Sequence, residues 1–312
     1  MRIVGIGDLV CDIYYDEKLN IIGAFGGISF CNIICNLQYM GYKTYIYGSC
    51  GDDYLGKICI DSLNDCNVKN NIKKVKDIYT KAYHIRKVKE NDRDVFRSIK
   101  YCPYCKKNSW YDESYIDEES IIKKIKDDDI LLFDNLNNRN QYIIDNTKNT
   151  KLLDLGTYYE FEKLTRKEII KKLDNKFEII NLNERVEKFL ITKLNCKDVI
   201  ELSKVIKAKL IIITRGINGN DFVYQNKIYS YPLDEIINEV DDSGAGDAFF
   251  SVIINNWLKN KQVFSPDKFN TWVNDTRELV KKILMLIGSR TYIKEMYLVT
   301  KNDICSWGDY NE

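Results

Sequence analysis

The residues with the clearest chemical potential form a glycine-rich turn that ends in an acid. Residues 240–250 read Val-Asp-Asp-Ser-Gly-Ala-Gly-Asp-Ala-Phe-Phe. Small residues in such a turn let backbone N–H groups approach an anion closely. The apolar run from Ala248 to Leu258 predicts a helix, which places the turn at a helix N-terminus. Unpaired N–H donors and the positive end of the helix dipole make such a terminus a site for phosphate.

Asp247 lies in the first turn of this predicted helix. A carboxylate beside an anion cradle suits phosphoryl transfer, because the cradle stabilises developing charge while the acid takes a proton from an attacking hydroxyl. An ordinary glycine turn with a first-turn acid is the alternative, and this stretch alone leaves both interpretations open.

The stretch from Ser243 to Phe249 closely resembles the C-terminal signature D-T-x-G-A-G-D-x-F of the ribokinase-like (PfkB-type) sugar kinases. Asp241 matches the leading acid, whereas Asp242 stands where a threonine is usual. No Gly-Lys-Ser/Thr follows the glycines, so the turn is not a Walker A loop. The resemblance implies that Asp247 is the catalytic base. The other residues of the implied anion hole are Gly244, Ala245 and Gly246.

Apolar strand-like runs alternate with helix-compatible segments along the chain. The predicted strands are Ile3–Gly7, Thr44–Tyr47, Ala82–Val88, Ile130–Phe133, Lys151–Leu155, Ile179–Asn181, Leu210–Thr214 and Asp221–Tyr224. The predicted helices are Asn32–Met40, Tyr54–Asp65, Ile116–Lys126, Arg166–Lys172, Val186–Leu194, Asp198–Lys207, Ala248–Leu258 and Thr271–Ile287. This alternation predicts an α/β fold with a mostly parallel sheet covered by helices on both faces. The resemblance implies a ribokinase-like three-layer α/β/α architecture, with residues 1–312 as one kinase domain.

Residues 72–111 depart from this pattern. Tyr83–Val88 alternates apolar and polar side chains, which is typical of a sheet with one exposed face. The kinases that this sequence resembles carry a small β-sheet lid over the sugar. We therefore expect residues 72–111 and residues 12–24 to form such a lid, and a homodimer through the lid is a further hypothesis.

A second glycine turn precedes Asn32. The segment resembles the family's N-terminal signature, G-G-x-x-x-N with a glycine nine residues later, which Gly41 supplies. Counting back from Asn32, Gly27 matches and Ile28 replaces the second glycine. The implied role of Gly27 and Asn32 is to bind sugar hydroxyls, since an asparagine offers both a donor and an acceptor. A helix N-cap at Asn32 is the alternative.

Two acids elsewhere have different implied roles. Asp12 follows the first strand, where the family places an aspartate that binds two sugar hydroxyls; a plain surface acid is the alternative. Gly51–Gly56 matches the family's G-x-D-x-x-G between a strand and a helix. Asp53 within it is expected to cap that helix, which is a structural role.

The nucleotide side is expected at Ile213–Gly219, which resembles a T-x-G-x-x-G turn around the ATP phosphates and ribose. The implied nucleotide contacts are Thr214, Gly216 and Gly219, with Arg215 reaching a phosphate. A glycine turn after a strand is common without any nucleotide, so this motif alone is weak.

The family's N-x-x-E metal motif is altered. Asn183 aligns well, but Val186 stands where the glutamate belongs. Asn181 and Glu184 satisfy the spacing two residues earlier, and Glu187 is a third candidate. We expect Mg²⁺, because nucleoside triphosphates travel with it, and predict that Asn183 and Glu184 influence it through water.

Cys102-Pro103-Tyr104-Cys105 has the spacing of half a zinc site. The sequence contains no second such pair, and its one histidine, His84, lies in a predicted lid strand. We expect two reduced thiols. A zinc ion shared across a dimer or with Cys66 is the alternative. Relatives carry a substrate-contacting loop here, so the divergence favours an unusual acceptor.

Bulk composition excludes several partners. The 312 residues contain 47 Lys and Arg against 46 Asp and Glu, a net charge of +1. This balance gives no support for nucleic-acid or membrane binding. The sequence has no run of about 18 apolar residues and no signal-peptide pattern. Scattered cysteines within apolar runs are typical of a reduced, cytoplasmic protein.

The ordered matches together imply an ATP-dependent kinase that phosphorylates a hydroxymethyl group of a sugar or sugar derivative, with Mg²⁺ as cofactor. K⁺ near Asp241 and Ser243, which occurs in some relatives, is a further hypothesis. A nucleoside kinase of the same fold is the first alternative, and it would need an aromatic pocket to stack the base. A catalytically silent regulator that binds a sugar or nucleotide is the second.

Overall fold

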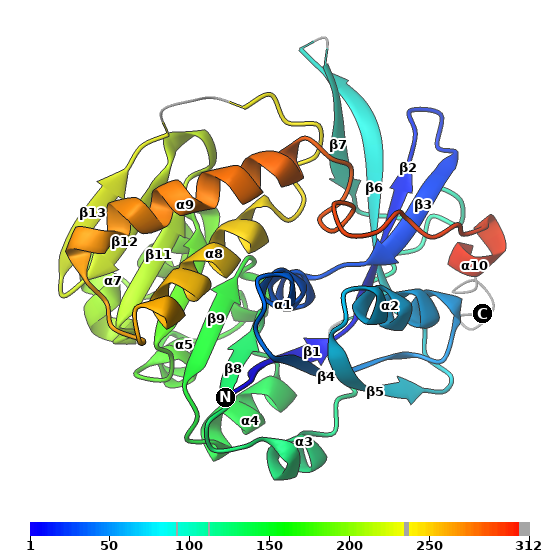
Figure 1. The fold of residues 1–312 in the computed structure, drawn as a ribbon. Helices are drawn as coiled ribbons and strands as arrows, with labels where there is room; N and C mark the ends of the chain where they lie inside the picture. Colours follow the sequence, from blue (N-terminus) through cyan, green and yellow to red (C-terminus); the bar gives the residue numbers. More distant parts are fainter. Residues whose placement is uncertain (92, 112, 234–236, 306–312) are drawn as a thin grey trace.

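The structure is a computed structural model that describes residues 1–91, 93–111, 113–233 and 237–305. In these residues, the central sheet has the order β13-β12-β11-β10-β9-β8-β1-β4-β5 (Figure 1). Its strands are β1 (Ile3–Asp8), β4 (Thr44–Gly51), β5 (Lys69–Val75), β8 (Ile130–Phe133), β9 (Lys151–Leu155), β10 (Ile179–Asn183), β11 (Leu210–Thr214), β12 (Asn220–Tyr224) and β13 (Lys227–Tyr231). Strands β5 through β11 of this order pair in parallel, and β12 and β13 add an antiparallel hairpin.

Helices cover both faces of the sheet, as parallel strands require. One face packs against α1 (Ser29–Tyr39), α2 (Tyr54–Asp65), α8 (Ala245–Lys259) and α9 (Pro266–Leu284). The opposite face packs against α3 (Glu118–Lys124), α4 (Asn138–Asn146), α5 (Arg166–Leu173), α6 (Glu184–Lys193) and α7 (Val199–Ile206). Successive residues of β8 alternate between the two cores: Leu132 joins the first, and Leu131 and Phe133 join the second. The predicted three-layer α/β/α architecture is therefore confirmed.

A second, smaller sheet forms the lid that the sequence predicts. Its order is β3-β2-β6-β7, built from β2 (Val10–Tyr15), β3 (Ile21–Gly26), β6 (Lys81–Glu90) and β7 (Arg93–Ile99). Only Leu9 separates β1 from β2, so the lid stands at the C-terminal end of β1 (Figure 1). Each outer lid strand is also bridged to the rest of the chain, through Ala24 with Tyr297 and through Phe96 with Asp241.

One boundary of the predicted lid is wrong. Residues 72–75 belong to β5, which pairs with β4 at the edge of the central sheet. The sequence misleads because an edge strand is largely exposed and so resembles the polar lid strands. Residue 92 of the predicted lid segment lies outside the described residues, as do residues 112, 234–236 and 306–312 of the predicted single domain. The assignment of residues 1–312 to one kinase domain stays a prediction.

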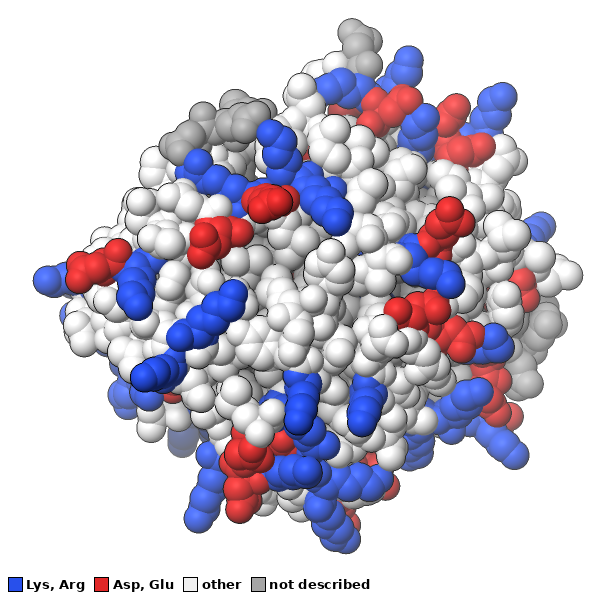
Figure 2. All heavy atoms as spheres, in the orientation of Figure 1, with Lys and Arg blue, Asp and Glu red and all other residues white. Residues whose placement is uncertain are grey.

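Charges on the face seen in Figure 2 are interspersed, with Lys and Arg next to Asp and Glu. No extended single-sign patch covers that face, in keeping with the near-zero net charge. None of the helices in the described ranges combines the length and apolar character that a membrane crossing demands. The described residues include all ten cysteines, and no two of them form a disulfide.

Candidate active site

The glycine-rich turn caps helix α8 as the sequence predicts. Gly244 is the N-cap residue, with φ at 82° in the left-handed region. A Cβ atom there would overlap Ser289, so the position requires glycine on two grounds. Gly246 differs, because a Cβ atom there would meet no other atom within 4 Å. Open space therefore borders the first turn of α8, where backbone N–H groups have no partner within the helix.

Asp247 is buried beside this space, with 8% of its surface exposed. Its Oδ2 accepts a hydrogen bond of 2.7 Å from Nδ2 of Asn32. Burial raises the pKa of the Asp247 carboxyl, and contacts from the Asn32 and Ser29 side chains lower it in part. The net upward shift makes Asp247 a stronger proton acceptor than a surface aspartate, which suits a general base.

Asn32 connects three segments of the site. It is the fourth residue of α1, whose N-cap is Ile28, so the alternative of an N-cap at Asn32 is wrong. Beyond its bond to Asp247, its Oδ1 accepts from Oγ of Ser289 at 3.1 Å. Ile28 has φ at 71° and ψ at 139°, a conformation that strongly favours glycine. Ile28 thus has a backbone conformation that would suit the glycine of the resembled signature.

Asp12 faces the same site from β2. Its carboxylate lies against Gly27 so closely that a Cβ atom on Gly27 would overlap it. The Asp12 side chain is buried, and burial raises its pKa to about 7, with Arg290 opposing the shift and Asp241 and Asp247 adding to it. Asp12, Gly27, Asn32 and Asp247 therefore form one cluster, although they lie far apart in the sequence.

Two further buried acids, Asp134 and Asp154, were missed by sequence reasoning. They lie at the ends of β8 and β9, where the C-terminal ends of neighbouring parallel strands meet. Asp154 accepts a hydrogen bond of 2.6 Å from Asn181. Burial, followed by the charge of Asp247, raises the Asp154 pKa to about 8, and burial raises the Asp134 pKa to about 7. An acid that ends an apolar strand was the available signal.

Arg290 supplies buried positive charge and was also missed. It is 5% exposed, and its Nη1 donates to Sγ of Cys35 at 3.2 Å. Its Nε and Nη2 find no hydrogen-bond partner among the described residues. Because Arg290 lowers the pKa of both Asp12 and Asp247, it stabilises the ionised acids of the site. Nothing in the local sequence around it marks this role.

The expected nucleotide turn links β11 to β12 and is more exposed. Thr214 ends β11, a 3₁₀ turn spans Gly216–Asn218, and Gly219 has φ at 88° with the backbone of Tyr231 pressed against it. The Arg215 guanidinium binds Glu187 through two hydrogen bonds of 2.8 and 2.9 Å, and its Nε binds Asp221 at 2.6 Å. Arg215 is thus held by carboxylates, and its contact with a phosphate stays a prediction.

The residues predicted to influence Mg²⁺ are largely engaged with protein groups. Asn183 caps α6 by accepting from the Val186 N–H at 3.0 Å, and it donates to the Gly156 carbonyl at 2.7 Å. Glu184 binds Lys188 at 2.7 Å. Asn181 is different, because its buried Oδ1 has no partner among the described residues and lies beside Asp154. Oxygen donors of this kind suit the hydrated Mg²⁺ ion.

An aromatic pair flanks the acid cluster. Tyr83 is the register partner of Asp12 across the β2–β6 pair, so the two side chains share one face of the lid. The Tyr83 ring lies over Trp110 with 4.9 Å between centroids and a 33° interplanar angle. Tyr83 keeps 37% of its surface exposed. A flat ring of a ligand could therefore stack beside the predicted hydroxyl-binding residues.

Comparison with known proteins identifies the family of the chain. The model of the pfkB family carbohydrate kinases matches residues 26–264, which is most of the chain. The protein therefore belongs to the pfkB family of carbohydrate kinases.

Individual relatives are more distant. A cytidine kinase from Thermococcus kodakarensis is 33% identical over 102 residues, which cover 31% of this chain and 35% of that protein. Fructokinase from Xylella fastidiosa, solved with ATP, has 14% identity and a TM-score of 0.69, covering 93% of this chain and 94% of its own. A Burkholderia thailandensis nucleoside kinase in complex with inosine has 15% identity and a TM-score of 0.67, covering 93% and 92%. These structural similarities confirm the ribokinase-like fold.

Proposed function

We propose that the protein transfers the γ-phosphoryl group of ATP to a hydroxymethyl group of a sugar or sugar derivative. The observation that carries this proposal is the pairing of a buried Asp247 with open space at Gly246, both in the first turn of α8. An acid whose pKa is raised by burial suits proton removal, and a helix N-terminus suits the transferring group.

In the proposed step, Asp247 takes the proton of the acceptor hydroxyl. The acceptor oxygen forms a bond to the γ-phosphorus, while the bond from that phosphorus to the β–γ bridging oxygen breaks and ADP leaves with the electron pair. Backbone N–H groups of residues 244–247 stabilise the charge on the transferring group. Asp247 and Asp12 are both buried, which limits the access of water to the proposed base.

The substrates would be held by two groups of residues. Asp12, Gly27 and Asn32 bind acceptor hydroxyls, in keeping with their common cluster around Asp247. The turn that contains Thr214, Gly216 and Gly219 binds ATP, the nucleotide present in the fructokinase structure. Mg²⁺ would neutralise phosphate charge when bound, and its water ligands would be held by Asn183 and Glu184 as predicted from the sequence, or by Asn181 and Asp154. K⁺ near Asp241 and Ser243 stays a prediction.

A nucleoside is the second candidate acceptor, and a specific observation favours it. The Tyr83–Trp110 pair lies on the lid face that carries Asp12, where a base could stack while the ribose hydroxyls reach the acid. The partial similarity to a cytidine kinase points in the same direction. A nucleoside also carries a hydroxymethyl group on its ribose, so the same chemistry applies.

A coupled assay of ADP release over a panel of sugars, sugar derivatives and nucleosides tests the proposal. We expect ADP release that depends on one acceptor class. Asp247→Asn keeps the shape of the side chain and should lower kcat by about 10²–10⁴-fold. Asp242→Asn is the matched control, because this neighbouring acid is largely exposed and contacts only the surface residue Arg97 in the described ion pairs. It should retain activity within a few-fold.

The outcomes separate the three functions. Acceptor-dependent turnover that survives Asp247→Asn undiminished would remove the base from the mechanism. ATP binding without turnover on any acceptor would favour the silent regulator. The predicted homodimer through the lid and the predicted cytoplasmic location stay predictions; the mass of the purified protein in solution tests the first.

A further inference from the structure

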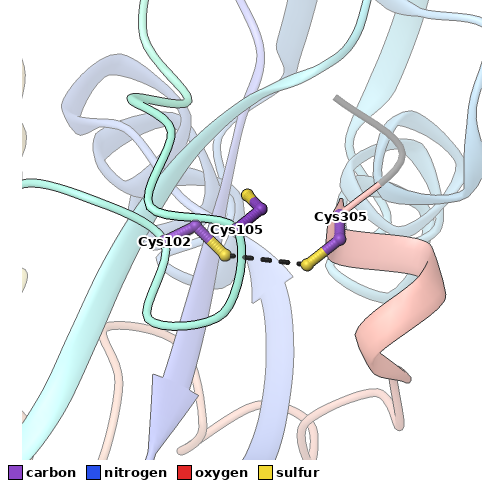
Figure 3. Close-up of side chains that lie close together, drawn as sticks. All are labelled: Cys102, Cys105 and Cys305. Carbon is purple, nitrogen blue, oxygen red and sulfur yellow. Dashed lines mark hydrogen bonds between the residues drawn. The ribbon is translucent and has the colours of Figure 1, made fainter. Parts of the chain in front are cut away.

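Three cysteine sulfurs meet at a point that the sequence did not reveal. Cys102 and Cys105 lie in the turn that follows β7, and Cys305 comes from the C-terminal helix α10 (Lys301–Cys305) (Figure 3). All three sulfur atoms lie within 4.8 Å of one another, and Cys102 Sγ is 3.9 Å from Cys305 Sγ. Cys66, the alternative partner considered from the sequence, contacts Cys35 instead.

The backbone of this turn fixes the position of the Cys102 sulfur. Backbone hydrogen bonds of 3.0 Å join the Cys102 N–H to the Lys107 carbonyl and the Lys106 N–H to the Cys102 carbonyl. Lys106 has φ at 62°, which turns the chain back on itself. The backbone N–H groups of Cys105 and Tyr104 donate hydrogen bonds to the Cys102 sulfur. Donors aimed at a sulfur stabilise its thiolate, the form that binds metals.

The cluster lies away from the candidate active site. Side chains alternate along β2, so Tyr15 and Asp12 occupy opposite faces of the lid. The cluster is on the Tyr15 side, where the Tyr104 and Tyr15 rings meet edge to face with 6.0 Å between centroids. Cys102 is fully buried, whereas Cys105 and Cys305 are half-buried. The site is therefore enclosed on one side and reachable from solvent on the other.

We propose that Cys102, Cys105 and Cys305 bind one Zn²⁺ ion as thiolates, with water as the fourth ligand. Zinc–sulfur bonds of about 2.3 Å in a tetrahedron place two sulfurs about 3.8 Å apart. The 3.9 Å between Cys102 and Cys305 already matches this spacing. Binding exchanges three thiol protons for the metal ion and involves no change of oxidation state.

The surroundings fit a soft cation better than a disulfide. A disulfide would require two sulfurs to approach to about 2.05 Å and would leave the third thiol unpaired.

A metal here would join the lid to the C-terminal segment. That segment donates from the Gly288 N–H to Asp241 at 2.8 Å and from Ser289 to Asn32, and Tyr297 pairs with Ala24 of β3. Zinc would anchor its far end at α10. We therefore expect zinc to raise the thermal unfolding temperature of the whole chain, since it binds only the folded arrangement.

Metal titration of the reduced, metal-free full-length protein, prepared with a phosphine reductant, tests the proposal. Co²⁺ should give one equivalent of thiolate charge-transfer and tetrahedral ligand-field absorption, and Zn²⁺ should displace it. Cys305→Ser should weaken Zn²⁺ binding by at least about tenfold. Cys196→Ser is the matched control, because Cys196 is also half-buried but its sulfur contacts the Leu194 carbonyl, away from the cluster.

Failure is equally specific. Absence of thiolate absorption in the Co²⁺-loaded wild type, or equal Zn²⁺ affinity in Cys305→Ser, overturns the site. If Cys305→Ser unfolds, Cys305→His decides, because it should retain Zn²⁺ and change the Co²⁺ spectrum. A preparation that loses two thiols on mild oxidation and binds no Zn²⁺ when reduced would identify a redox pair instead.

Discussion

The proposed acceptor side and the proposed nucleotide side of the candidate active site differ in their electrostatics. On the acceptor side, Asp12, Asp134, Asp154 and Asp247 are buried, and burial is the largest cause of the raised pKa of each. On the nucleotide side, Arg215 is matched by two carboxylates in a partly exposed turn. The acids of the proposed acceptor side are thus poorly solvated in their ionised form, whereas the charges of the proposed nucleotide turn are already paired.

This difference predicts which substitutions should change the activity and which should change the stability of the fold. An under-solvated acid destabilises the folded chain but provides strong interactions for a bound hydroxyl. A satisfied ion pair stabilises the turn and leaves little for a ligand to gain. Substitutions on the acceptor side should therefore change activity strongly, and those on the nucleotide side should have smaller effects on catalysis.

After Asp247→Asn, the largest expected effect comes from Gly246→Ala. A methyl group there meets no protein atom but enters the space proposed for the transferring phosphoryl group. We expect kcat to fall by about 10²–10³-fold, with a stability change within about 1 kcal/mol. Steady-state kinetics and chemical denaturation measure the two effects.

Gly244→Ala is the contrasting control. It adds a side chain at positive φ against Ser289, so it should destabilise the fold itself. Normal turnover in Gly246→Ala would show that the transferring phosphoryl group does not occupy this space. It would also contradict the strong effect on activity that we expect for this part of the site.

Asp12→Asn should show the next largest effect. It removes a charged hydrogen-bond acceptor for the sugar, so kcat/KM for the acceptor should fall by about 10–100-fold, while the KM for ATP stays nearly constant. The free energy of unfolding should increase, because a buried carboxylate is replaced by a neutral amide. Initial rates with each substrate varied in turn, together with denaturation, check both parts. An equal loss for ATP and acceptor would argue against a hydroxyl-binding role.

The pH dependence of activity and stability should run in opposite directions. The folded-state pKa of Asp12, about 7, lies above its ordinary value of 3.8, so the folded chain binds more protons than the unfolded chain between these values. The Asp12 contribution to the free energy of unfolding therefore falls as pH rises across that window. Activity should rise through the same window, because Asp12 and Asp247 must be ionised.

Denaturation of wild type and Asp12→Asn over this pH range isolates that contribution. The stability advantage of the variant should grow toward pH 7, and the acid limb of kcat/KM in the wild type should lie near pH 7. An advantage that is constant with pH would contradict the assigned pKa direction.

Glu187→Gln should have the smallest effect and tests the other side. Arg215 keeps its bond to Asp221, and the amide can still accept from the guanidinium. We expect ATP affinity to change by no more than about fivefold, equivalent to about 1 kcal/mol. ATP binding by calorimetry checks this. A loss of ATP affinity in Glu187→Gln as large as the loss of acceptor kcat/KM in Asp12→Asn would show that the ion pairs of Arg215 matter for function as much as the buried acids do.

Local sequence signals predicted the central strands well. The bounds of β8, β9 and β11 match the predicted runs, because strands buried on both faces are continuously apolar. The bounds of α2 match as well, where Asp53 caps the helix through the Gly56 N–H at 2.7 Å. The edge strands β5 and β13 and the short helix α10 were missed, since exposed or short elements carry weak periodic patterns.

The candidate site divides in the same way. The sequence alone determined that a glycine turn precedes α8 and that Asp247 lies in its first turn, because helix-terminus chemistry is local. Tertiary structure decided which distant groups face Asp247, including Asp154 and Arg290, since sheet order and loop paths set those distances.

The cysteine cluster is the extreme case. The sequence showed half a site at Cys102 and Cys105, and only the fold brings Cys305 beside them from 203 residues away. The physical reason is that backbone capping and periodic burial act over a few residues, whereas ligand sets and buried charge pairs depend on how the sheets bring remote segments together.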